Sequence, residues 1–182
     1  MMTHSQRPHE LALPVASLAA LRRALADVVG ADHAAHTLQT AGNAAGDAFH
    51  DILTGASADT APTDWSEAAF WRRFAELFAR RGWGHLSNER VHEGVGALSA
   101  DDWAEADPAF GEERPSCSFT AGLFANLLGR VSDDEVAVLE VECRSRGDQR
   151  CRFLYGSAAA LDAVYARLRS GDAVGETLAT LR

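Results

Sequence analysis

Residues 115–155 read PSCSFTAGLFANLLGRVSDDEVAVLEVECRSRGDQRCRFLY, and this stretch decides the fold. After a proline and a cysteine, an apolar segment containing a glycine predicts a helix over residues 119–128. Alternating apolar and polar residues at 135–143, then a second run at 150–155, predict two strands joined by a turn around Gly147. All three cysteines of the chain, Cys117, Cys143 and Cys151, fall within this stretch. It therefore predicts a helix followed by a β-hairpin, with thiols concentrated where the two meet.

The predicted hairpin brings two cysteines side by side. If its turn centres on the glycine, Cys143 and Cys151 lie opposite each other with Cβ atoms about 4.5–5.5 Å apart. Cys117, at the start of the helix, can dock over them and supply a third sulfur. A tetrahedral zinc site needs a fourth ligand, and Glu140 and Glu142 are the local candidates. In a regular strand both glutamates point away from the face of Cys143, so either one needs a bulge, and spacing alone does not choose. The alternative is a set of buried thiols without a metal.

Two segments, CSFTAGLFANLLG at 117–129 and VAVLEVECRSRGDQRCRF at 136–153, resemble the 4-vinyl reductase domain family. The family pattern is a cysteine entering a helix of small residues, then Glu-x-x-Cys, a turn with glycine, and Cys-x-Phe. The resemblance is looser over residues 70–99. It implies a fold like that of the 4-vinyl reductase domains and TRAPP subunits, in which an antiparallel sheet and helices surround an apolar cavity. Related sensor domains of aromatic-responsive bacterial activators hold zinc through three cysteines and this glutamate. The resemblance thus implies a closed, structural zinc site with these ligands: Cys117, Glu140, Cys143 and Cys151.

The remainder of the chain predicts helices around a second hairpin. Apolar residues recur at helical spacing over 17–29, 32–53, 66–81 and 158–169. Asp64 or Ser66 can cap the third of these helices and Ser157 the last. Residues 83–93 and 94–99 predict a strand pair, and the polar residues 101–110 predict a short helix and a loop. The fold class is therefore α+β, with an antiparallel sheet of about four strands in two hairpins, covered on one face by helices.

We expect three parts along the chain: an N-terminal helical segment over 1–63, a domain resembling the 4-vinyl reductase domain over 64–171, and a C-terminal tail over 172–182. Gly42 and Gly46 lie four residues apart on one predicted helix, which favours close packing against another helix. Because this N-terminal segment is rich in alanine and carries these glycines, it also suits a homodimer interface.

Composition excludes several classes of function. The net charge is −9, and no dense run of lysine and arginine is present, which argues against binding to nucleic acid. No apolar run approaches the roughly 18 residues that span a membrane. The polar N-terminus lacks the pattern of a secretory signal, so we expect a cytoplasmic protein. Three cysteines, an odd number, are a poor disulfide framework.

Aromatic side chains predict a ligand pocket between the helix at 66–81, the helix at 118–129 and the sheet. Taken singly, each is more typical of core packing; together they suit a small apolar ligand. His85 could orient a phenol or a carboxylate. The full predicted lining is Phe70, Phe74, Phe78, Trp83, His85, Phe119, Phe124, Leu139 and Tyr155.

The function expected from these features is a stand-alone sensor or carrier domain with structural zinc, which binds a small apolar or aromatic molecule. One alternative is a tetrapyrrole-binding or vinyl-reductase-associated protein of (bacterio)chlorophyll metabolism. Another is a scaffold or adaptor, as TRAPP subunits are. No nucleotide or flavin motif is present, which favours a binding role over an enzymatic one.

Overall fold

The computed structural model describes residues 10–55 and 64–179. Within these ranges the expected helices and strands are present, with small shifts at their ends. The expected loop at 54–63 and the polar N-terminus lie mostly outside the described residues. The helices and strands are α1 (Val15–Val29), α2 (Ala31–Gly55), α3 (Glu67–Ala79), β1 (Ser87–His92), β2 (Val95–Ala100), α4 (Ser118–Ser132), β3 (Ala137–Glu142), β4 (Cys151–Gly156), α5 (Ala158–Arg169) and α6 (Val174–Ala179), with short 3-10 turns η2 (Pro108–Phe110) and η3 (Arg144–Arg146).

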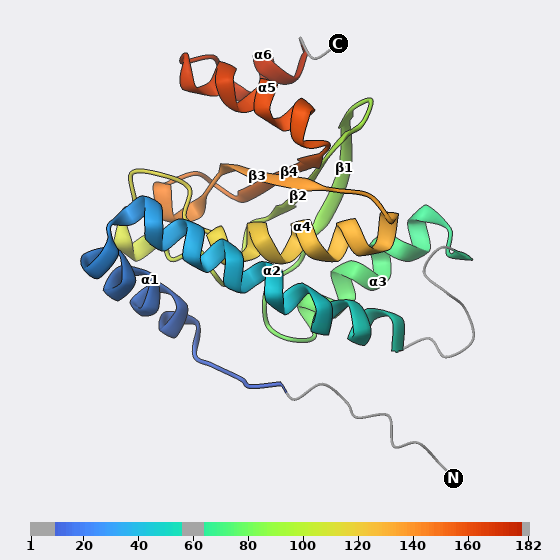
Figure 1. Cartoon of the computed structure of the whole chain (residues 1–182), viewed down its shortest axis with the longest axis horizontal. Coiled ribbons are helices and arrows are strands. Elements are labelled where there is room, and N and C mark those ends of the chain that lie inside the picture. Colours follow the sequence, from blue (N-terminus) through green and yellow to red (C-terminus); the bar gives the residue numbers. More distant parts are fainter. Residues whose placement is uncertain (1–9, 56–63, 180–182) are drawn as a thin grey trace.

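The four strands form one antiparallel sheet in the order β1-β2-β4-β3 (Figure 1). Each hairpin contributes two neighbouring strands, and the hairpins meet where β2 pairs with β4. Gly94 in the first hairpin turn has φ +76°, a conformation that glycine adopts without strain. The predicted fold class, α+β with four antiparallel strands in two hairpins, is confirmed.

Helices cover both faces of this sheet, so the expectation of a single covered face is wrong. On one side, here called the near face, Cys151 and Phe153 pack with α3 and α4. On the other side, the far face, Val141 and Leu154 pack against the apolar residues of α5 and α6. Figure 1 shows α5 and α6 on the opposite side of the sheet from α2 and α4. The helix at 158–169 was predicted correctly, but its periodicity does not say which sheet face it covers.

The first two helices form further layers over the near face. α1 packs on α2, and α2 runs along α4 (Figure 1). A Cβ atom on Gly42 would lie 1.9 Å from the backbone oxygen of Phe119, and one on Gly122 would lie 1.9 Å from the backbone oxygen of Gln39. The close packing predicted from Gly42 and Gly46 is therefore confirmed. Both glycines face α4 of the same chain, so the suggestion that they form an interface between two copies is wrong.

Among the described residues, no helix combines the length and the apolar character needed to cross a membrane. The longest helix, α2, has 25 residues but carries charged and polar side chains along its exposed side.

Candidate metal centre and aromatic cluster

Three thiols and one carboxylate converge where the start of α4 meets the second hairpin. The potential ligand atoms of Cys117, Glu140, Cys143 and Cys151 all lie within 4.8 Å of one another. The Cys117 sulfur is 4.0 Å from that of Cys143 and 3.9 Å from that of Cys151. None of the three forms a disulfide, and all are almost completely buried. The residues inferred from the family pattern thus form one compact group that could hold a metal ion.

A β-bulge brings the glutamate to this group. Glu140 pairs with Phe153, whereas Glu142 pairs with Arg152, so the ladder shifts by one residue at Val141. Val141 packs with the far-face cluster, and Cys143 packs with the near-face cluster. Because of this extra residue, Glu140 and Cys143 reach the same face of the sheet, which a regular strand would not allow.

The other candidate, Glu142, is occupied elsewhere. Its carboxylate accepts hydrogen bonds from Arg150 at 2.8 Å and from Arg152 at 3.5 Å. Arg152 also forms an ion pair with Glu89 on β1. The structure therefore separates the two glutamates that spacing alone left open, with Glu140 beside the thiols and Glu142 paired with arginines.

The donor set fits a tetrahedral zinc ion. With Zn–S bonds of about 2.3 Å, sulfurs at the corners of a tetrahedron lie about 3.8 Å apart, close to the separations found here. One oxygen of Glu140 accepts the backbone N–H of Cys117 at 2.8 Å, while the other, Oε1, is buried without a hydrogen-bond partner. A buried carboxylate oxygen normally has a partner. A cation among the sulfurs would supply it.

The electrostatics of the group favour a cation. Burial raises the pKa of Glu140 and of Cys117 well above their ordinary values, because four acidic groups share a space with little water. Hydrogen bonds from the Cys117 and Cys151 thiols lower the pKa of Cys143, so one thiolate is stabilised at the expense of its neighbours. A divalent ion would allow all four groups to ionise together.

Two residues that the sequence analysis missed fix the start of α4 beside Cys117. The buried carboxylate of Glu105 accepts the backbone N–H groups of Phe119 at 3.0 Å and Thr120 at 2.8 Å, and also the Thr120 hydroxyl. The buried indole N–H of Trp103 donates to the same hydroxyl at 2.8 Å. Both residues lie in the stretch predicted to be a polar loop. The one available signal was a tryptophan among acidic residues.

Aromatic rings fill the space between α3, α4 and the near face. Phe74, Phe78 and Phe124 are fully buried and in mutual contact, with ring centroids 5.1–5.6 Å apart. Trp103 lies 5.5 Å from Phe124, which in turn lies 5.4 Å from Phe153 on β4. We call these rings, together with Phe49, Trp83 and Phe119, the aromatic cluster.

Most of the predicted pocket residues belong to this cluster or border it, with two exceptions. Leu139 packs with the far-face cluster, because alternation along β3 turns it away from Glu140. His85 is exposed, and its Nδ1 lies 2.6 Å from a carboxylate oxygen of Asp102. This partner raises the pKa of His85. Placing Leu139 and His85 in the aromatic pocket was therefore wrong.

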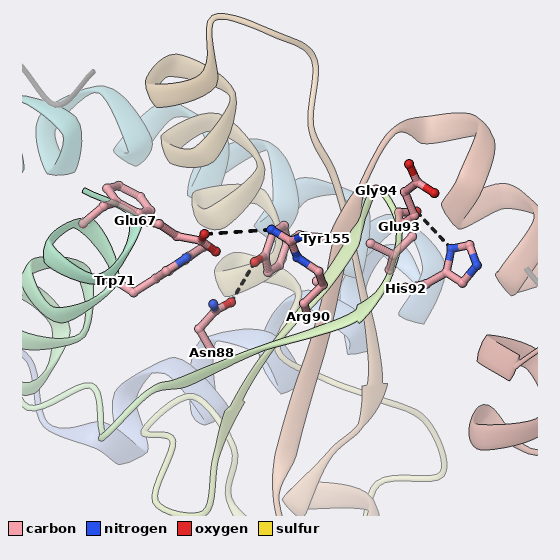
Figure 2. A pocket seen from close by; sticks show the side chains of 11 residues that line it. Glu67, Trp71, Asn88, Arg90, His92, Glu93, Gly94 and Tyr155 are labelled. Atoms are coloured by element: carbon pink, nitrogen blue, oxygen red, sulfur yellow. Dashed lines mark hydrogen bonds and ion pairs between the residues drawn. The ribbon is translucent and has the colours of Figure 1, made fainter. Parts of the chain in front are cut away.

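Phe70 and Tyr155 line an open cleft at the other end of the sheet from the cysteines (Figure 2). Its volume is about 490 Å³. The residues around it are Glu67, Phe70, Trp71, Asn88, Arg90, His92, Glu93, Gly94, Val95, Gly96 and Tyr155.

Comparison with known proteins identifies the family pattern. Residues 99–157 match the family model of the vinyl-4-reductase domain, so the chain carries such a domain over this segment, which includes all four candidate ligands. The resemblance to the 4-vinyl reductase domain family is thereby confirmed. No curated protein matches the sequence.

Solved structures show the same fold. One is the phenol-responsive sensory domain of the transcription activator PoxR with phenol, at 20% identity and a TM-score of 0.70, covering 90% of this chain and 84% of that one. Another is a vinyl-4-reductase family protein from Methanocaldococcus jannaschii, at 19% identity and a TM-score of 0.53, covering 82% of this chain and 83% of that one. At these identities the likeness establishes the fold.

Proposed function

We propose that this protein is a sensor or carrier that binds a small apolar or aromatic molecule within its aromatic cluster, beside a structural zinc ion. The observation that carries the proposal is the packing of Phe74, Phe78 and Phe124 around Trp103, directly adjoining the candidate metal centre. Flat apolar walls with few polar groups are typical of sites for small aromatic ligands. The fold shared with a phenol-responsive sensory domain agrees with this role.

The metal has a structural role in this proposal. Three thiolates and one carboxylate occupy all four positions of a tetrahedral ion, and none is left open for water or substrate. The ion would join the start of α4 to β3 and β4. Trp103 and Glu105 hold that same start through Thr120, so the position of α4 beside the ligand depends on the metal and on these residues together.

Phenol is the probe for the ligand site. Phe124→Trp enlarges a fully buried ring at the middle of the cluster, so it should weaken phenol binding about tenfold or more while the protein stays folded. Isothermal titration calorimetry measures the affinity. Tyr165→Trp, on the exposed side of α5, adds an indole outside the cluster and should bind like the wild type. Unchanged phenol affinity in a folded Phe124→Trp protein would contradict this location.

The metal is tested separately by native mass spectrometry of protein purified from its own host. Cys143→Ser, Cys151→Ser and Glu140→Gln should each lose zinc. Their melting temperature should fall by about 10 °C, since about 1 kcal/mol corresponds to about 2–4 °C in a domain of this size. Glu142→Gln, which changes the neighbouring glutamate paired with arginines, should keep its zinc. Unchanged metal content in both cysteine variants would end the zinc assignment.

A further inference from the structure

The open cleft between α3 and the first hairpin is separate from both the metal centre and the aromatic cluster. Cys151 begins β4, whereas Tyr155 lies near its end, so the two sites are at opposite ends of this strand. In Figure 2, Glu67 and Trp71 from α3 face Asn88 and Arg90 from β1 across the cleft. A volume of about 490 Å³ is within the range of small-molecule sites.

The cleft has flat aromatic walls. Tyr155 lies directly against Gly96, where an added Cβ would come within 2.2 Å of the ring. Trp71 lies 5.4 Å from the Tyr155 ring and 4.7 Å from the Phe70 ring, measured between centroids. All three rings are only partly buried and keep surface facing the cleft. Such walls accept a planar ring by stacking or edge contact.

Hydrogen-bond donors stand beside these walls. The Tyr155 hydroxyl donates to Oδ1 of Asn88 at 2.7 Å, which leaves the amide N–H groups of Asn88 for another acceptor. Burial raises the pKa of Tyr155 to about 12, so the hydroxyl keeps its proton at neutral pH. The guanidinium of Arg90 lies 3.9 Å from the carboxylate of Glu67, and both side chains are mostly exposed, 78% and 69%. A pair this long and this exposed is weak and is readily exchanged for a better acceptor.

We propose that this cleft binds a single-ring aromatic carboxylate. Its ring packs between Trp71 and Tyr155, and its carboxylate replaces that of Glu67 at Arg90. A guanidinium binds a carboxylate through two parallel hydrogen bonds, a geometry that the long Glu67 contact does not achieve. Asn88 adds a further donor. Of the other charged groups of the cleft, His92 and Glu93 lie toward the hairpin tip, away from the aromatic walls (Figure 2).

Benzoate tests this site in the full chain, with benzamide as the uncharged analogue of the same shape. Calorimetry should show benzoate binding at least tenfold more tightly than benzamide. Arg90→Gln should weaken benzoate at least tenfold and leave benzamide unchanged. Glu67→Gln should strengthen benzoate about threefold, because it removes the internal competitor. Arg80→Gln breaks another exposed arginine–glutamate pair at the end of the same helix, and it should leave benzoate affinity unchanged.

Three results would overturn the inference: no benzoate binding at millimolar concentration, equal affinity in the wild type and Arg90→Gln, or an equal loss in Arg80→Gln. The Phe124→Trp variant separates this site from the proposed function. Benzoate binding should survive that substitution, whereas phenol binding should not. If Phe124→Trp weakens benzoate as much as phenol, the carboxylate binds in the aromatic cluster and the cleft assignment is wrong.

Discussion

Glu105 shows how one buried side chain links stability to pH. Burial raises its pKa from 4.5 to about 7, although the Thr120 hydroxyl and two backbone N–H groups donate to its oxygens. Since the pKa is higher in the folded protein than in the unfolded chain, folding favours the protonated form. That stabilisation is complete below about pH 4.5 and is lost as the pH rises through about 7.

Glu105→Gln removes this titration. Relative to the glutamine variant, the wild type should lose about 3 kcal/mol of unfolding free energy between about pH 4.5 and pH 8, at about 1.36 kcal/mol per pKa unit. Urea unfolding at several pH values measures the difference. Glu113→Gln, on an exposed loop residue, should follow the wild type throughout. A difference between wild type and Glu105→Gln that stays constant with pH would contradict the shifted pKa.

At the same scale, the sequence predicted the residues of the metal centre better than their surroundings. The three cysteines and Glu140 were identified because thiols are rare and the family pattern is specific. Trp103 and Glu105 were missed, since they act through hydrogen bonds to the start of a helix distant in sequence. His85 and Leu139 were misplaced because the direction of a side chain depends on strand register and on partners such as Asp102.

Among the secondary-structure elements, the closest contact is the crossing of α2 and α4. Gly42 on α2 and Gly122 on α4 each lie against the backbone of the other helix, so the two helices approach more closely than side chains would permit. α4 carries Cys117 at its N-cap and Phe124 in its middle. The position of α2 therefore affects both the metal centre and the aromatic cluster.

Gly42→Ala tests this crossing. The new methyl group would collide with backbone atoms of α4, which cannot turn aside as a flexible side chain can, and we expect a loss of about 2–3 kcal/mol in unfolding free energy. Gly55→Ala, at the end of the same helix with nothing within 4 Å, should be neutral or slightly stabilising, because alanine favours helix. Chemical denaturation compares the two. Equal effects would show that the crossing tolerates a side chain.

Helical periodicity and the glycine spacing were sufficient to predict these elements and their close packing. They could not predict the layer formed by α5 and α6, because an amphipathic helix records that one side is buried without recording what buries it. The bulge at Val141 was also hidden, since an extra residue in a strand leaves the composition unchanged. Only the need to bring a glutamate to the cysteines pointed to it.

At the scale of the whole molecule, α1 is the outermost layer and leaves apolar side chains uncovered. Leu21 and Val28, seven residues apart on one side of the helix, are 55% and 82% exposed. The division into a dimerising segment over 1–63 and a ligand domain over 64–171 stays a prediction, and these residues, rather than the glycines of α2, are where it can be tested.

If α1 mediates homodimerisation, Leu21→Glu combined with Val28→Glu should convert a dimer into a folded monomer, since charged side chains resist burial in an interface. Light scattering after size-exclusion chromatography measures the mass. Tyr165→Glu alters an exposed apolar residue on α5 and should remain dimeric. A monomeric wild type at micromolar concentration, or a dimer that persists in the double variant, would contradict the prediction.

The bulge at Val141 has a consequence for how the chain can vary. Two residues separate Glu140 from Cys143, and their number sets the direction of the carboxylate. Many apolar side chains could replace Val141 on the far face and leave the four donors together. Removing one residue from this spacer would instead restore a regular ladder and turn the glutamate and Cys143 to opposite sides of the sheet. Here chain length, more than chemical identity, must be preserved.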